Sequence, residues 1–233
     1  MVQLPREFIE WNYFARRALV SQILEGASID PYRLQLEFTR HNPVLCTAAL
    51  QDNGTIEVNG KVIGVGYVLK KEFLAEASRK FEEHIKVADE ALAAHPEREK
   101  EILEEYSRRG IKLLLDYIYL PRGMAEERVD FEKMASLELA LRIPHSSKHT
   151  WRIVQRSRKA CLVFYQPPAI SFEVRCSISI HLDDDYHRFV NLVHDAFHYT
   201  PPEARENRPT YIFHVEEVFN NSPSRAGFGK KLT

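Results

Sequence analysis

The segment from Ile170 to Leu182 alternates apolar and polar residues, and this pattern most limits what the chain can fold into. Apolar residues at every second position lie on one face of a β-strand, where they pack against a core. The segment therefore predicts one long strand, whose apolar positions are Ile170, Phe172, Val174, Cys176, Ile178, Ile180 and Leu182.

Other segments predict further strands. Two pairs, Asn53-Gly54 and Asn59-Gly60, separate runs rich in β-branched residues, which predicts a hairpin that turns at both pairs. Gly64 and Gly66 share one face of the following strand, so a helix, a partner strand or a ligand is expected to pack closely there. The predicted strands besides the longest are 44–50, 55–58, 61–69, 137–143, 159–165 and 210–219, with a helix entering from Glu126 as the alternative for 137–143.

Apolar residues that recur every three or four positions predict helices. Residues 71 to about 118 show this pattern twice, with a break at His95-Pro96, and predict a helical hairpin. We expect a single domain over residues 1–233 with a helical insertion at about 71–136. The order of elements predicts an α+β fold, an antiparallel β-barrel with flanking helices and an inserted helical hairpin. The other predicted helices are 5–25, 147–156 and one behind Asp183, Asp184 and Asp185 that ends near 199.

The composition argues against several classes of protein. Lys plus Arg number 32 against 33 Asp plus Glu, so the net charge of -1 does not suit a nucleic-acid partner. No apolar run approaches the roughly 20 residues of a membrane helix, and the first residues lack the form of a signal peptide. We therefore expect a cytoplasmic protein. The glycine-rich nucleotide motifs are absent, and the widely spaced Cys46, Cys161 and Cys176 predict reduced core residues.

Hydroxyl and cationic side chains gather after Pro144, where a predicted strand gives way to a predicted helix. The free N–H groups of a first helical turn, together with cationic side chains, suit a phosphate. A serine-capped helix that binds nothing is the alternative. The candidate residues of this cluster are Ser146, Ser147, Lys148 and Arg152.

The surroundings of this cluster resemble a known family. A strand, Ser-x-Lys, a short helix, the run RSRKACLVFY at 156–165 and a long strand containing FEVRCSI at 172–178 follow one another. This order is similar to that of the pyridoxamine 5′-phosphate oxidase-like FMN-binding split-barrel superfamily. The similarity covers residues 38–69 and 137–220 by order of elements, and about 146–176 by motif.

The resemblance implies a split β-barrel that binds FMN as a homodimer, with the flavin between the subunits. Lys148 and one of the neighbouring serines would hold the phosphate, and Thr47 would meet the ring or the ribityl chain. Glu173 stands where the oxidases of the family carry a glutamine that meets the flavin ring. The residues assigned to the cofactor in this way are Ser146, Ser147, Lys148, Arg152, Thr47, Glu173 and Arg175.

The helix that follows Asp185 carries His187, His194 and His198 along one stripe. His194 and His198 are four residues apart and can share a metal ion, which makes them the candidate metal ligands. Haem is an alternative cofactor, because some relatives of the split-barrel family handle haem. Histidines on a helix flank or at a subunit contact are the plain structural alternative.

These observations predict an FMN-binding protein, a flavin-dependent oxidoreductase whose substrate or electron donor is a small molecule. One alternative is a haem-binding split barrel that uses the histidine helix, and another is a non-catalytic protein that docks a partner through the helical insertion. No nucleophile with a paired base is recognisable. Tyr165, His149 and His198 are the side chains considered for acid–base chemistry.

Overall fold

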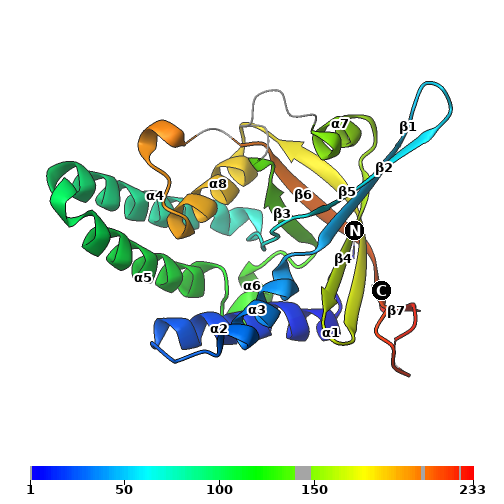
Figure 1. The fold of residues 1–233 in the computed structure, drawn as a ribbon, viewed down its shortest axis with the longest axis horizontal. Coiled ribbons are helices and arrows are strands. Elements are labelled where there is room, and N and C mark those ends of the chain that lie inside the picture. Colours follow the sequence, from blue (N-terminus) through cyan, green and yellow to red (C-terminus); the bar gives the residue numbers. More distant parts are fainter. Residues whose placement is uncertain (1, 140–147, 206–207, 226) are drawn as a thin grey trace.

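The predicted long strand is the centre of the fold in the computed structural model, which describes residues 2–139, 148–205, 208–225 and 227–233. It is β5, Ile170–His181, and it pairs on both sides with antiparallel strands. The sheet runs in the order β2-β1-β4-β5-β6-β3, as Figure 1 shows. Its other strands are β1 (Val44–Leu50), β2 (Ile56–Val62), β3 (Lys133–Leu137), β4 (Lys159–Gln166), β6 (Thr210–Asn220) and β7 (Lys230–Lys231), which pairs with β6.

The two edges of this sheet approach each other and close it into a barrel. After β2 the chain continues to Gly66, which pairs with Ala135 of the opposite edge strand β3. A second bridge joins Leu69 to Val129. Because these contacts are isolated bridges rather than a continuous ladder, the barrel is split along this seam. The predicted α+β fold, an antiparallel split barrel with flanking helices and an inserted helical hairpin, is confirmed.

The barrel interior is filled by the apolar face of β5. Phe172, Val174 and Ile178 are buried, as the period-two pattern predicted. An N-terminal helix closes one end, and its Phe8 ring packs edge-on against Phe164 and Phe172. This helix consists of α1 (Arg6–Ile9), the π-helical turn η1 (Glu10–Phe14) and α2 (Ala15–Leu24).

The predicted helical hairpin is formed by α4 (Lys71–Ala94) and α5 (Glu99–Tyr117), joined by η3 (Pro96–Arg98). Its apolar stripe, which includes Leu74, Phe81 and Ile85, is buried within the chain. The helix α8 (Asp185–Phe197) packs against both helices of the hairpin, and the Asp184 side chain caps its first turn. Figure 1 shows α8 lying across α4, with the far ends of α4 and α5 extending away from the barrel. Among the described helices, none is long and apolar enough to cross a membrane.

Several boundaries differ from the predictions. Asn59 and Gly60 lie inside β2 rather than in a turn, because β1 is long enough to pair with β2 as far as Val62. Only Gly54 of the two Asn-Gly pairs has the positive φ that such a turn requires. Of the strand predicted at 137–143, Leu137 is the last residue of β3 and residues 138 and 139 are not in a strand, while residues 140–143 lie outside the described part. Helical elements that were not predicted are α3 (Pro31–Phe38), η2 (Thr39–His41), α6 (Arg122–Arg128) and η5 (Pro202–Ala204).

Candidate functional site

The residues predicted to bind the cofactor phosphate lie at the start of α7 (His149–Arg156). Lys148 is the N-cap residue of this helix, and its own side chain makes no capping hydrogen bond to the first turn. The helix packs on β1 and β2, where Asn59 Nδ2 donates a hydrogen bond of 2.9 Å to Thr150 Oγ1. Ser146 and Ser147 lie outside the described residues.

Two buried polar atoms beside this junction lack partners. Lys148 Nζ and Thr47 Oγ1 are shielded from solvent and make no hydrogen bond in the described part of the chain. Thr47 is opposite Asn59 in the β1–β2 ladder, so both unpaired atoms belong to elements that meet at α7. A buried polar group without a partner is costly and calls for an explanation, such as a ligand.

The predicted arginines are already paired with carboxylates. Arg152 forms an ion pair with Glu57 of β2. Arg175 Nε lies 2.6 Å from Glu173, its Nη1 lies 3.3 Å from Glu217, and its guanidinium covers the ring of Phe219. Arg175 and Thr47 line the same open groove, of about 630 Å³, on the β1–β4 side of the barrel. The charges of both arginines are therefore largely balanced within the chain.

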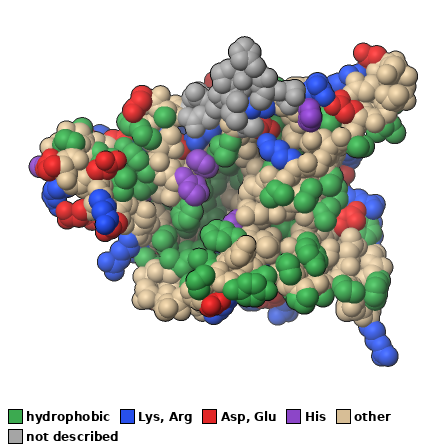
Figure 2. Space-filling model, in the orientation of Figure 1, with side chains coloured by type: hydrophobic (Ala, Val, Ile, Leu, Met, Phe, Trp, Pro, Cys, Tyr) green, Lys and Arg blue, Asp and Glu red, His purple; other side chains and the backbone are tan. Residues whose placement is uncertain are grey.

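A more enclosed cavity lies at the seam of the barrel, between β3, α2, α8 and the end of α5. It has a volume of about 590 Å³, in the range of small-molecule sites. Figure 2 shows a hollow on this face with hydrophobic and histidine side chains around it. We name it the glycine-walled cavity. Its described lining is Arg16, Lys61, Val62, Ile63, Gly64, Gly66, Tyr67, Leu114, Ile118, Tyr119, Ala135, Ser136, Leu137, Leu139, Phe189, Val190, Val193, His194, Phe197 and His198.

Gly64 and Gly66 form one wall of this cavity. Both belong to the extended segment that joins β2 to the seam, and they are two residues apart on one face. A Cβ built on Gly66 would meet no atom within 4 Å, so the space in front of its backbone is open. The close approach predicted from these glycines can therefore be made by a ligand.

Arg16 enters the cavity from α2, and no carboxylate of the described residues pairs with it. One of its N–H groups meets His41 Nδ1 at 2.6 Å, and its buried Nε has no partner among the described residues. Its guanidinium carbon lies 5.8 Å from the centre of the Phe38 ring and 6.0 Å from that of Tyr119. Burial, and secondarily the charge of Arg16, lowers the pKa of His41 to about 3, so His41 is neutral at physiological pH.

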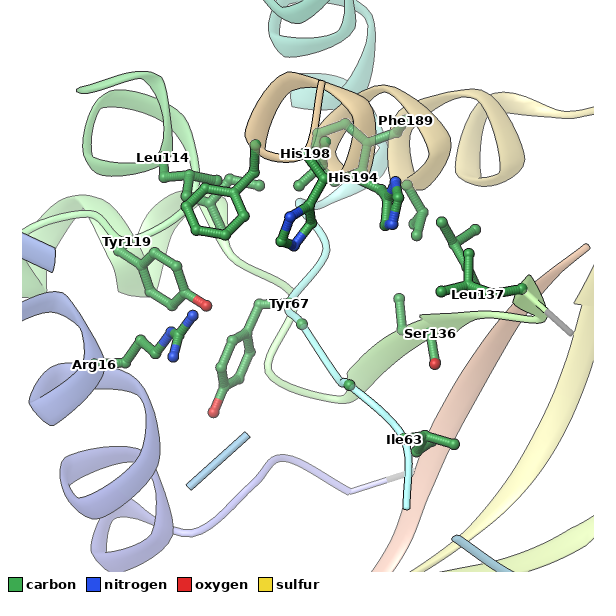
Figure 3. A pocket seen from close by; sticks show the side chains of 18 of the residues that line it. Arg16, Ile63, Tyr67, Leu114, Tyr119, Ser136, Leu137, Phe189, His194 and His198 are labelled. Atoms are coloured by element: carbon green, nitrogen blue, oxygen red, sulfur yellow. The ribbon is translucent and has the colours of Figure 1, made fainter. Parts of the chain in front are cut away.

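The three histidines of the predicted stripe do not share one site. His194 and His198 line the glycine-walled cavity, with ring centres 5.2 Å apart (Figure 3). His187 faces a separate polar hollow, where burial lowers its pKa. Burial and the nearby His194 also lower the pKa of His198. In the described ranges no group of three or more His, Cys, Asp or Glu side chains is placed to hold a metal ion.

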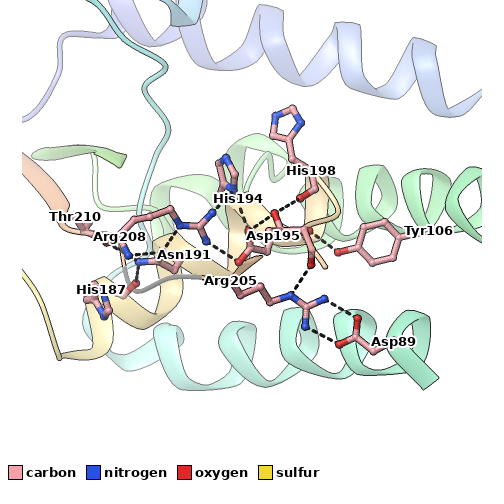
Figure 4. Close-up of polar contacts among 11 residues, drawn as sticks. Asp89, Tyr106, His187, Asn191, His194, Asp195, His198, Arg205, Arg208 and Thr210 are labelled. Atoms are coloured by element: carbon pink, nitrogen blue, oxygen red, sulfur yellow. Dashed lines mark hydrogen bonds and ion pairs between the residues drawn. The ribbon is translucent and has the colours of Figure 1, made fainter. Parts of the chain in front are cut away.

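The imidazole of His194 is part of a buried network of polar side chains (Figure 4). Its Nδ1 lies 3.1 Å from both Asp195 Oδ1 and Arg208 Nη1, so Nε2 is the ring nitrogen left for the cavity. Arg208 donates a 2.6 Å hydrogen bond to Asp195 Oδ2 and another, of 2.8 Å, to Asn191 Oδ1. Such a second partner fixes the orientation of an imidazole.

The acid–base candidates are spread over the molecule. Tyr165 is exposed on β4 and donates a hydrogen bond to the carbonyl of Pro168. His149 opens α7, whereas His198 lies in the glycine-walled cavity. The sequence did not single out Arg16, because only the packing of α2 beside Tyr119 shows that no described carboxylate pairs with it.

No family model matches the chain, and no curated protein matches it. In structure it is similar to an F420 reductase, at 12% identity and a TM-score of 0.34, over 82% of this chain and 98% of the other. It is also similar to HupZ of Group A Streptococcus, at 10% identity and a TM-score of 0.37, over 84% and 97%. A nimC/nimA family protein from Clostridium acetobutylicum aligns at 5% identity and a TM-score of 0.34, over 87% and 96%.

Proposed function

We propose that the chain binds FMN and is a flavin-dependent oxidoreductase that acts on a small molecule. The observation that carries the proposal is the pair of buried, unpaired polar atoms Lys148 Nζ and Thr47 Oγ1. The resemblance in the sequence assigns both residues to the cofactor, Lys148 to its phosphate and Thr47 to its ring or ribityl chain. A bound FMN would give each atom a partner.

The chain would contribute binding and orientation, while the flavin supplies hydride or electron transfer. Lys148 and the free N–H groups of α7 would hold the phosphate, because the positive end of a helix and an ammonium both favour an anion. Arg152 would contribute less than Lys148, because Glu57 already balances its charge. Ser146 and Ser147 remain proposed phosphate ligands. Glu173 and Arg175 would border the cofactor as an ion pair.

We expect Lys148→Ala to weaken FMN binding by about 10- to 100-fold, the loss of one charged hydrogen bond. Riboflavin, which lacks the phosphate, should bind the variant as well as it binds the unaltered chain. Quenching of flavin fluorescence measures both affinities. The matched control is Lys86→Ala, which removes an exposed lysine of α4. Equal losses for FMN and riboflavin, or no FMN binding by the unaltered chain, would refute the phosphate assignment.

The proposed homodimer would use the apolar outer face of the β1–β2 hairpin. Leu50, Ile56, Val58 and Val62 of this hairpin are 65%, 68%, 75% and 65% exposed. They lie on one face of the two strands, and Figure 1 shows the hairpin extending beyond the rest of the molecule. A contiguous exposed apolar face of this kind marks an interaction surface. A second copy of the chain would cover it and also close the groove that contains Thr47 and Arg175.

We expect the unaltered chain to sediment as a dimer and Val58→Glu to sediment as a monomer, because the charge would be buried in the interface. Analytical ultracentrifugation measures the mass of each. Thr55→Glu, in the exposed turn of the same hairpin, introduces the same charge and should leave the dimer intact. A monomeric unaltered chain, or a dimer that survives Val58→Glu, would contradict the proposed surface.

A further inference from the structure

We propose that the glycine-walled cavity binds a flat, apolar organic acid whose carboxylate pairs with Arg16. This site is distinct from the proposed FMN phosphate site at α7. The proposal does not depend on flavin binding, because none of the residues that support it belongs to the proposed FMN site.

The charge of the cavity favours an anion. Its described lining contains Arg16, Lys61 and two histidines, and no aspartate or glutamate. Lys61 is already paired, with its Nζ 3.0 Å from Glu138. Asp195 lies behind His194 and is paired with Arg208. Arg16 is therefore the cation of this lining whose charge no described carboxylate balances.

The surroundings of Arg16 prepare it for a carboxylate. His41 occupies one N–H group and is neutral, so it does not balance the charge. The rings of Phe38 and Tyr119 flank the guanidinium and limit its motion. An unpaired cation in an apolar setting is costly, and a guanidinium binds a carboxylate through two parallel hydrogen bonds. A ligand carboxylate at this place would remove that cost.

The shape of the cavity favours a flat body. The backbone at Gly64 and Gly66 forms a wall without side chains, and the space before Gly66 is open. Phe189, Val193 and Phe197 of α8 also line the cavity and supply apolar contacts. Figure 3 shows that Arg16 and the histidines enter from different helices, α2 and α8. A ligand with its carboxylate at Arg16 would place its other end near His194.

Calorimetric titration of the full chain with 2-naphthoate and its neutral analogue 2-naphthamide tests the proposal. We expect the acid to bind at least about tenfold more tightly than the amide, because the amide lacks one charged hydrogen bond to Arg16. Arg16→Gln should abolish this preference, and Arg16→Lys should retain part of it. Gly66→Val should weaken both ligands, because its side chain would fill the open space. Arg33→Gln, on the exposed face of α3, and Gly123→Val, where a Cβ meets no atom, are the matched controls.

Equal affinity for acid and amide would overturn the proposal, as would an acid preference that survives in Arg16→Gln. Thermal unfolding of each variant shows whether it is folded, and Arg16→Lys keeps the test decisive if Arg16→Gln does not fold.

Haem is a second ligand of this chemistry, because it also has carboxylates on a flat ring. Its Soret band identifies it when it is bound. A haem complex weakened by both Arg16→Gln and His194→Ala would support the site, and one insensitive to Arg16→Gln would refute it. Loss of FMN binding in Lys148→Ala, with naphthoate binding retained, would separate the two sites.

Discussion

Replacing Asp195 by alanine is expected to lower the free energy of unfolding by about 3–5 kcal/mol, because a buried cation would lose its counterion. Arg208 is 2% exposed and Asp195 5% exposed, and their side chains are 2.6 Å apart. Asp195 also accepts hydrogen bonds from His194 and from Thr200. With alanine at this position, Arg208 would keep its charge in the core without the carboxylate that it pairs with in the described part of the chain.

Urea unfolding followed by circular dichroism measures this effect. The matched control is Asp89→Ala, which breaks the pair with Arg205, where both side chains are more than 20% exposed. That loss should be about 1 kcal/mol or less. A double variant, Asp195→Leu with Arg208→Met, should recover most of the stability, since an apolar pair can replace a buried ion pair. An Asp195→Ala variant no less stable than Asp89→Ala would contradict this account.

The same ion pair predicts acid sensitivity. Burial raises the pKa of Asp195, but hydrogen bonds from His194 and Arg208 outweigh it and hold the pKa at about 2, below its usual 3.8. The carboxylate therefore contributes its full stability above pH 3.8, and this contribution is lost as the pH falls toward 2. Because Asp195 also holds His194, the stability of the core and the orientation of this imidazole in the glycine-walled cavity depend on one residue.

Local patterns were sufficient to predict the long strand and the helical hairpin. In β5 the alternation of apolar residues matches a strand with one buried face, and in α4 the spacing of Leu74, Phe81 and Ile85 matches a helix with one buried stripe. Such elements are predictable because one buried face produces a regular spacing of apolar residues along the sequence.

Elements that depend on distant partners were not predictable in this way. Asn59-Gly60 has the composition of a turn, yet its pairing with β1 and the hydrogen bond from Asn59 to Thr150 keep it in a strand. The strand β3 exists because it pairs with β6 and closes the barrel at Gly66. For the same reason the sequence could single out Lys148 as a candidate, but could not reveal that Arg16 lacks an acidic neighbour.

Gly110 shows the same dependence on tertiary structure, and its replacement by alanine gives the second large prediction. In an isolated helix alanine would stabilise α5, since glycine is the poorer helix former by about 1 kcal/mol. In the folded chain a Cβ on Gly110 would overlap the carbonyl oxygen of Ala196 in α8. This close approach lets Tyr106 donate to the carbonyl of Asp195, and the imidazole of His84 lies beside the carbonyl of Ala196.

We therefore expect Gly110→Ala to lower the free energy of unfolding by about 1–3 kcal/mol, the usual cost of overpacking a core. Gly123→Ala is the matched control, because a Cβ there meets no atom within 4 Å and should raise stability by up to about 1 kcal/mol. Urea unfolding of the two variants measures both effects. If the two variants change the free energy of unfolding in opposite directions, the packing of α5 on α8, rather than helix propensity, determines the residue at position 110. A Gly110→Ala variant as stable as Gly123→Ala would show that the helical hairpin can move away from α8 at no cost.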